Sequence, residues 1–271
     1  MSIAVLLTCF NRKKETLACL EAVFSQRIPS HYEVKVYLTD DGSSDGTGEA
    51  VKQSFPDVEV LNGDGSLYWN GGMRVAFQAA MEIGYDYYFW LNDDTHLYSD
   101  AFERLLALAT NSDAIIAGSV CDPISKEHTY GGIKQVSRWL PLKFKPIKPD
   151  MEQFQHCDTF NGNCVLIPAH AVEILGNLDA GFTHSVGDFD YGLRAKKHRI
   201  TCLVAQGYFG ECARNPIPDC FNKNVPLAKR WRALHSPKGL PPKEWITFTR
   251  RYTSLIWPIY LCRLYLRMFK P

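Results

Sequence analysis

The chain has 271 residues, 46% of them hydrophobic, and its formal net charge is +1. This length is sufficient for one large α/β domain or two small ones, and the apolar content excludes a largely disordered chain. The N-terminal residues show neither a basic leader nor a small-residue cleavage site, so we expect a cytoplasmic protein.

Strand-like and helix-like segments alternate along the first hundred residues. Apolar or aromatic runs predict strands at 3–7, 34–38, 58–61 and 85–91. Helical spacing predicts helices around 17–24 and over 49–55 and 73–83. This alternation predicts an α/β fold, Rossmann-like, in which a mostly parallel central sheet carries helices on both faces.

Three polar loops follow the predicted strands, at 8–12, 40–45 and 92–95. Ligands of open α/β sheets bind outside the carboxyl ends of the strands. We therefore expect the three loops to converge at one edge of the sheet and to form a binding site there.

The regular alternation gives way after residue 99. The sequence predicts a strand at 114–118, a turn-rich hairpin at 121–132 and a further strand at 160–168. Residues 138–155 hold three prolines and three lysines without periodicity, and we interpret them as a flexible loop that closes over substrate. Helices follow at 169–175 and from Gly187, the latter with acids in its first turn and bases in its last.

The C-terminal segment is basic and aromatic. Residues 223–271 contain eleven Lys or Arg and a single acid, Glu244. Such a helical tail suits either an anionic membrane surface or the acidic surface of a catalytic domain. A spanning helix is not expected, because only eleven uncharged residues separate Arg251 from Arg263 and Pro258 interrupts them.

The nine cysteines form no Cys-x-x-Cys pair, and several lie inside apolar runs. We interpret them as reduced core residues, neither zinc ligands nor disulfides.

Adjacent carboxylates at Asp93 and Asp94 would repel each other unless a cation or a hydroxyl donor lay between them. Mg²⁺ or Mn²⁺ with a nucleotide diphosphate meets that need, although a solvated turn with a helix-capping Asp is equally compatible with the pair alone.

The acidic loop after the second predicted strand fits neither a calcium site nor a phosphatase site. A calcium loop starting at Asp41 would need Glu at position 52, which is Lys52. A haloacid-type phosphatase would need Asp where Thr39 stands. Both functions are therefore excluded for this loop.

Several motifs together resemble glycosyltransferase family 2 with its GT-A fold, in particular the rhamnosyltransferase-like branch. Four of them are Thr-x-Phe-Asn-Arg at 8–12, Asp-Asp-Gly-Ser-Ser-Asp-Gly-Thr at 40–47, Asn-Gly-Gly-Met-Arg at 70–74 and Asn-Asp-Asp-Thr at 92–95. The others are Gly-Asn-Cys-Val-Leu-Ile-Pro at 162–168 and Gly-Asp-Phe-Asp-Tyr-Gly-Leu-Arg-Ala at 187–195. The resemblance covers roughly residues 1–215, and ordered motifs at these spacings are far more specific than any one alone.

The resemblance implies a donor site. Thr8 and Asp41 would bind the pyrimidine base, Asp93 the ribose, and Asp94 a Mg²⁺ or Mn²⁺ ion that bridges the diphosphate. The nucleotide-binding residues that we predict are Thr8, Phe10, Arg12, Asp41, Asn70, Arg74 and Asp93. Asn70 is included because a Gly-Gly turn after it would let the backbone approach the donor, and Arg74 because it would meet a phosphate, although a solvated helical Arg fits equally well.

The resemblance also implies that Asp188 is the catalytic base of an inverting displacement, with Asp190 raising its proton affinity. Two positions depart from the family pattern. Gly187 stands where Glu usually precedes the base, and no His follows the strand predicted at 200–205. For Asp190 and Arg194 we favour a structural pairing at i,i+4 of the helix.

The sequence thus predicts a GT-A catalytic domain over 1–220, with a nucleotide-sugar half at about 1–98 and an acceptor half at about 99–220, followed by a basic helical tail over 221–271. We expect it to transfer a hexose or deoxyhexose from a UDP- or dTDP-sugar to a lipid-linked or oligosaccharide acceptor in bacterial surface polysaccharide synthesis. The basic segment 223–271 is compatible with peripheral association at the inner membrane face, and the apolar residues of the tail are compatible with a homodimer. We expect no nucleic-acid partner. The alternatives are a non-catalytic sugar-nucleotide-binding protein and a nucleotidyltransferase, although the Gly-rich N-terminal loop of the latter is missing after Leu7.

Overall fold

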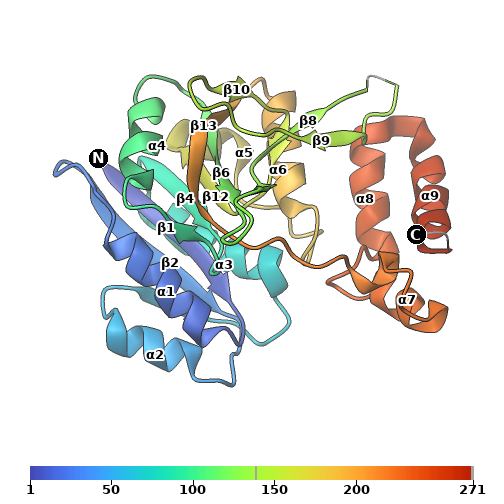
Figure 1. The fold of residues 1–271 in the computed structure, drawn as a ribbon, viewed down its shortest axis with the longest axis horizontal. Helices are drawn as coiled ribbons and strands as arrows, with labels where there is room; N and C mark the ends of the chain where they lie inside the picture. Colours follow the sequence, from blue (N-terminus) through green and yellow to red (C-terminus); the bar gives the residue numbers. More distant parts are fainter. Residues whose placement is uncertain (138, 270–271) are drawn as a thin grey trace.

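The computed structural model describes residues 1–137 and 139–269 (Figure 1). Arg138, at the start of the predicted flexible loop, and residues 270–271 of the predicted tail lie outside the described residues. A central sheet flanked by helices forms one side of the molecule, and three C-terminal helices, α7, α8 and α9, lie together on the other (Figure 1).

The first half of the sheet is parallel throughout. Its strands are β1 (Ser2–Cys9), β2 (Glu33–Asp40), β3 (Glu59–Asn62) and β4 (Tyr87–Leu91). They lie in the order β3-β2-β1-β4, and β1 is buried from Ile3 to Cys9. A strand buried on both faces needs the continuous apolar run that the sequence has here.

The second half of the chain extends the same sheet. β12 (Cys164–Pro168) runs antiparallel between β4 and β6 (Ile115–Cys121), and β13 (Cys202–Glu211) is parallel to β6. Three short strands pair antiparallel with β6 or β13: β5 (His96–Leu97), β7 (His128–Tyr130) and β10 (Gln155–His156). The mostly parallel sheet is therefore confirmed, and the reversed strand β12 is where the parallel order gives way.

Helices cover both faces of this sheet. One apolar core packs α1 (Lys13–Phe24), α2 (Thr47–Ser54) and α4 (Ala101–Ala109) against one face. A second core packs α3 (Tyr68–Ile83), α5 (Ala169–Leu175) and α6 (Gly187–Lys197) against the other. The predicted two-faced α/β architecture is confirmed.

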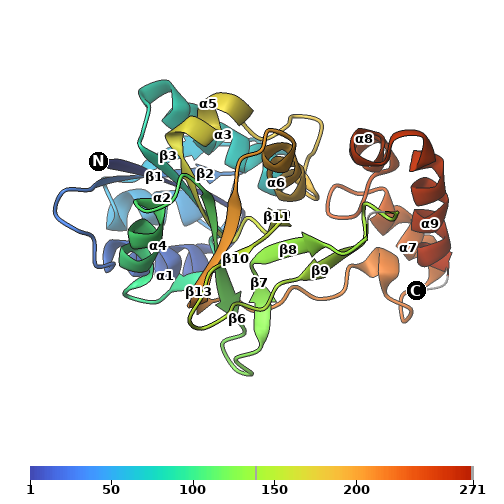
Figure 2. The same cartoon turned by 90° about the horizontal axis from the view of Figure 1, so that it is seen from above.

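Two segments differ from the sequence-based expectation. The expected flexible loop at 138–155 contains β9 (Phe144–Pro146), which pairs with β8 (Gly132–Gln135); with β11 (Thr159–Phe160) they form a separate three-stranded sheet (Figure 2). Helix α3 begins at Tyr68, five residues earlier than predicted, so Gly71 and Gly72 lie inside the helix and form no turn.

The C-terminal segment folds into η1 (Asp219–Phe221), α7 (Leu227–Leu234), α8 (Pro242–Thr253), η2 (Ser254–Ile256) and α9 (Trp257–Phe269). A small core joins α7 and α9 through Leu234, Leu264 and Met268, while Phe248 of α8 packs on Phe182 and on Leu193 of α6. Pro258 does not break α9, because it occupies the first turn, where no backbone N–H is needed. None of the described helices has the length and apolar character needed to cross a bilayer.

The cysteines carry no disulfide among the described residues, and eight of the nine are buried. Cys262 of α9 is the exception to the expected core placement, because its side chain is exposed.

Candidate functional site

The three polar loops meet at the carboxyl edge of the sheet, as predicted. The backbone N–H of Asn11 donates to the Ser43 hydroxyl at 2.9 Å, and the Asn11 side-chain oxygen accepts from the N–H of Ser44 at 2.7 Å. Asp45 accepts from the N–H of Lys13 at 3.1 Å. These bonds join the loops after β1 and β2, and Arg12 reaches across to the loop after β4.

A cavity of about 330 Å³ opens where these loops meet. Five of the predicted nucleotide-binding residues line it: Thr8, Phe10, Arg12, Asp41 and Asp93. Phe10 is 45% exposed, and it therefore offers an accessible aromatic face beside the buried polar groups of Thr8 and Asp41. Bases stack on such faces.

Asp41 organises one wall of this cavity. Its carboxylate accepts hydrogen bonds from the backbone N–H groups of Gly65, Leu67 and Tyr68, at 2.9, 3.2 and 2.8 Å. Asp41 thus caps the start of α3 from a neighbouring strand, which explains why that helix begins before the position expected from local sequence. A carboxylate fixed in this way is held in place for a ligand.

Arg12 bridges both carboxylates of the predicted metal site. Its guanidinium lies 3.1 Å from Asp93 Oδ1 and 2.7 Å from Asp94 Oδ2. Burial raises the pKa of Asp93 to about 7, and Asp94 contributes in the same direction, while the Arg12 charge opposes both. The repulsion expected between the adjacent acids is therefore met here by a cation of the protein itself.

The residues around Asp94 offer part of a metal site. Asp93 and Asp94 supply the carboxylate oxygens that hard divalent ions prefer. Over residues 1–137 and 139–269, however, no group of three or more His, Cys, Asp or Glu side chains is arranged to hold an ion. The thiol of Cys212 lies 3.5 Å from Asp94 Oδ1. An ion at Asp94 would complete its coordination with phosphate and water oxygens.

The structure places Asn70 and Arg74 away from the cavity lining. Asn70 is fully buried, and its amide donates to the carbonyls of Asp179 and Phe182, at 3.0 and 2.6 Å. Arg74 donates to the carbonyl of Leu178 at 3.0 Å and borders a different cavity. Both side chains hold the segment before α6 against α3, because the helix that carries them starts earlier than expected.

Asp188 opens α6 and lies next to the cavity without lining it. Its two oxygens accept from the N–H groups of Gly162 and Phe189, at 3.0 and 2.8 Å. Burial raises the pKa of Asp188 to about 6, although both hydrogen bonds lower it. The indole of Trp69, which lines the cavity, packs directly on Gly162. Asp188 is therefore one residue layer behind the cavity wall, and its pKa lies in the range that a general base requires.

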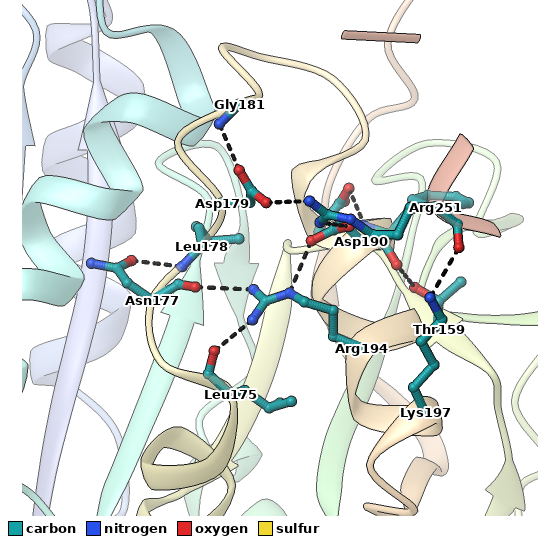
Figure 3. A network of polar contacts seen from close by, with 12 residues as sticks. Thr159, Leu175, Asn177, Leu178, Asp179, Gly181, Asp190, Arg194, Lys197 and Arg251 are labelled. Carbon is teal, nitrogen blue, oxygen red and sulfur yellow. Dashed lines mark hydrogen bonds and ion pairs between the residues drawn. The ribbon is translucent and has the colours of Figure 1, made fainter. Parts of the chain in front are cut away.

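Asp190 has a structural role and does not tune Asp188. Its fully buried carboxylate pairs with Arg194 at 2.9 Å, as the i,i+4 spacing predicts, and with Arg251 of α8 at 2.5 Å (Figure 3). Arg251 also pairs with Asp179 at 2.6 Å, and the Tyr252 hydroxyl lies 2.7 Å from Asp190. The expectation that Asp190 raises the proton affinity of Asp188 is wrong, since burial is what raises that pKa.

Six further residues line the cavity: Cys9, Gly65, Tyr68, Trp69, His184 and Lys238. His184 stacks edge-on against Tyr68, and burial together with the Lys238 charge lowers its pKa. Lys238 belongs to the C-terminal segment predicted as a tail. That segment is fastened nearby, because the Ser185 hydroxyl donates to the Gly239 carbonyl at 3.0 Å and the Glu244 carboxylate accepts from the Thr183 N–H at 3.1 Å.

Many solved structures share this fold, among them two with a bound nucleotide sugar. A mannosyltransferase, PcManGT from Pyrobaculum calidifontis in complex with GDP-Man and Mn²⁺, matches with a TM-score of 0.60 and 14% identity, over 97% of this chain and 69% of that one. S. aureus TarS 1-349 in complex with UDP-GlcNAc matches with a TM-score of 0.60 and 13% identity, over 99% of this chain and 73% of that one. The fold is thus of the GT-A glycosyltransferase type.

The family is defined by the sequence itself. The model of glycosyl transferase family 2 matches residues 4–172, more than half of the chain. This chain belongs to glycosyl transferase family 2, which confirms the family expected from the strand-end motifs. A comparison with curated proteins found no match.

Proposed function

We propose that this glycosyltransferase transfers a hexose or deoxyhexose from a UDP- or dTDP-sugar, with inversion, to a glycan acceptor of bacterial surface polysaccharide. The observation that carries the proposal is the cavity that gathers Thr8, Phe10, Arg12, Asp41 and Asp93 from three strand ends. The motif resemblance to the rhamnosyltransferase-like branch is the basis for the donor and acceptor classes.

In this proposal the residues of the site contact different parts of the donor. Thr8 and Asp41 bind the base, with Phe10 against its face, and Asp93 binds the ribose. Arg12 and Lys238 provide positive charge for the diphosphate. Asp94 holds Mg²⁺ or Mn²⁺, which when bound neutralises charge that develops on the departing nucleoside diphosphate.

Asp188 accepts the proton of the attacking acceptor hydroxyl in this proposal. The new bond forms from that oxygen to the anomeric carbon while the bond to the diphosphate oxygen breaks on the opposite face. A pKa of about 6 leaves the carboxylate ionised at neutral pH, yet basic enough to take the proton.

The test is a nucleotide-binding screen. UDP, dTDP, GDP and CDP are added with and without Mn²⁺ to the wild type and to Asp94→Ala, and the melting temperature is measured. A metal-dependent increase with UDP or dTDP that Asp94→Ala abolishes supports the donor site. No increase with any nucleotide rejects the proposal.

A second candidate function is sugar-nucleotide binding without catalysis. The observation in its favour is that both oxygens of Asp188 already accept backbone hydrogen bonds and that Asp188 does not line the cavity. Full transfer activity in Asp188→Asn would remove Asp188 from catalysis, whereas nucleotide binding in a wild type that transfers no sugar would support the non-catalytic function.

The proposed membrane association rests on the outer face of the C-terminal segment. Leu255, Ile259, Leu266 and Phe269 are 90%, 57%, 60% and 50% exposed. Basic residues of α8 and α9 accompany them, a combination suited to an anionic lipid surface.

A further inference from the structure

A second large cavity separates the C-terminal helices from the β8–β9 hairpin. Its volume is about 910 Å³, within the range of ligand-binding clefts. Figures 1 and 2 show the hairpin reaching away from the main sheet toward α8 and α9. We call this cavity the hairpin groove. Its walls come from the segment before β9, from η1, from α8 and from α9.

The hairpin groove combines an apolar floor with a cationic rim. Its floor includes Phe144, Trp245 and Leu264, and its rim carries the exposed side chains of Lys143, Arg263 and Arg267. No acidic residue lines it, and within the described part of the chain no carboxylate pairs with these three cations. Arg263 and Arg267 are four residues apart on one helix, where like charges destabilise each other. The Arg267 guanidinium lies over the ring of Phe221, 4.3 Å from its centroid, and an anion in the groove would offset the repulsion between the two arginines.

Tyr260 provides an independent sign of a polar ligand. It lines the hairpin groove, only 7% of its surface is exposed, and its hydroxyl has no hydrogen-bond partner among the described residues. A buried hydroxyl without a partner is costly. A phosphate oxygen that reached this hydroxyl would accept its hydrogen bond, and the surrounding apolar floor would accept a hydrocarbon chain.

The hairpin groove adjoins the proposed reaction centre from two directions. Phe144 in its floor packs edge-on against Phe189, with ring centroids 5.3 Å apart, and Phe189 directly follows Asp188. Leu240 lines the groove, while Lys238, two residues earlier, lines the nucleotide cavity. The groove is thus placed to hold an acceptor whose far end reaches Asp188.

We propose that the hairpin groove binds the phosphate and the first carbons of a lipid-phosphate-linked acceptor. This inference rests on the proposed function, because it chooses the lipid-linked class of acceptor and places it. The phosphate pairs with Arg263, Arg267 and the Tyr260 hydroxyl, and the chain lies on Phe144 and Trp245. Leu266 opens from the groove onto the exposed face of α9, along which a longer chain continues.

The test uses dodecyl phosphate below its micellar concentration, with binding measured by isothermal titration calorimetry on the full chain. Two matched ligands serve as controls. Dodecyl maltoside has the alkyl chain but no phosphate, and inorganic phosphate has no alkyl chain. We expect dodecyl phosphate to bind at least tenfold more tightly than either.

Three variants locate the site. Tyr260→Phe removes only the unpaired hydroxyl, and we expect a three- to tenfold weaker affinity with an unchanged melting temperature. Arg263→Gln with Arg267→Gln should weaken binding at least tenfold. Tyr32→Phe, which removes another buried unpaired hydroxyl, and Arg250→Gln, outside the groove, should leave the affinity within twofold.

Equal binding of dodecyl maltoside, or groove variants that bind dodecyl phosphate as well as the wild type, would overturn the proposal. So would binding to phosphatidylglycerol vesicles that dodecyl phosphate does not compete with, because that result indicates a membrane surface and not an acceptor site. UDP binding is measured on the same samples. If UDP binds and dodecyl phosphate does not, the groove proposal fails alone; if only dodecyl phosphate binds, the proposed donor function fails alone.

Discussion

The side-chain oxygen of Asn70 lies directly against the α-carbon of Gly187, so that a methyl group at position 187 would overlap it. Asn70 is fully buried and its amide holds two carbonyls of the segment that leads into α6. Gly187 stands where the family resemblance predicts Glu. The structure gives a physical reason for that departure, because the space next to the base is taken by Asn70.

We expect Gly187→Ala to lower the free energy of unfolding by about 1–3 kcal/mol, the usual cost of overpacking. Gly187→Glu should lower the free energy of unfolding further than Gly187→Ala, and it should not improve activity. Asn70→Ala alone costs stability because the carbonyls of Asp179 and Phe182 lose a donor. Urea unfolding of the single variants and the double variant tests the contact. Since Asn70→Ala makes room at position 187, the double variant should lose less free energy of unfolding than the two single variants lose together, by at least about 0.5 kcal/mol. Strictly additive losses would contradict the overlap.

The pKa of Asp188 predicts an acidic limb in the rate profile. Below about pH 6 the carboxyl is protonated and accepts no proton, so kcat/KM should fall about tenfold per pH unit; above pH 6 it should level off. Asp188→Asn should reduce kcat at least about 100-fold and leave the Kd for UDP unchanged.

Asp93, whose pKa is about 7, titrates in a nearby range, and the two groups are separated by measuring the Kd for UDP across the same pH range. A limb near pH 6 that persists in the residual rate of Asp188→Asn would assign it to another group.

Lys238 connects the C-terminal segment to nucleotide binding. Because Lys238 lines the cavity, we expect Lys238→Ala to weaken UDP binding about tenfold, the loss of one charge-assisted hydrogen bond. Uridine, which lacks the phosphates, should bind both proteins equally. Lys243→Ala is the matched control, since Lys243 is exposed and does not line the cavity. If UDP and uridine weakened together, Lys238 would act on the base or on the fold and not on the diphosphate.

The strand-end loops could be predicted because their signals are local. Thr8, Asp41 and Asp93 each follow a buried apolar run, and parallel strands bring their carboxyl ends to one edge. The start of α3 could not be predicted in this way, because Leu67 provides no side-chain cap and Asp41 provides the cap from another strand. Local sequence therefore places Asn70 in a turn at the nucleotide, whereas the earlier helix start directs it toward the segment before α6.

Lys238 marks another limit of local patterns. Its charge is one of eleven in a basic segment, and nothing in its spacing separates it from the others. It reaches the nucleotide cavity only because Gly239 and Glu244 bind the Thr183–Ser185 segment and Arg251 binds Asp190. Of the two interpretations of the tail, packing against the rest of the chain is what the fold shows for α8.

Arg251 and Arg250 provide a matched pair for the attachment of α8. Arg251 joins the fully buried Asp190 to Asp179, whereas the adjacent Arg250 is exposed and only lies over the ring of Trp257. Removing one partner of a buried ion pair costs about 3–5 kcal/mol, and Arg194 and Tyr252 remain to moderate the loss, so we expect roughly 2–4 kcal/mol for Arg251→Ala. Arg250→Ala should cost less than about 0.5 kcal/mol.

Because α6 carries both Asp188 and Asp190, Arg251→Ala should also reduce kcat, and limited proteolysis should release the segment after residue 222 sooner than in the wild type. Arg251→Lys should recover part of the stability, since the charge is kept while the two-carboxylate geometry is lost. If Arg250→Ala and Arg251→Ala were equally stable and equally resistant to protease, the buried pair would not be what holds α8, and the contact of Phe248 with Phe182 would have to carry that attachment alone.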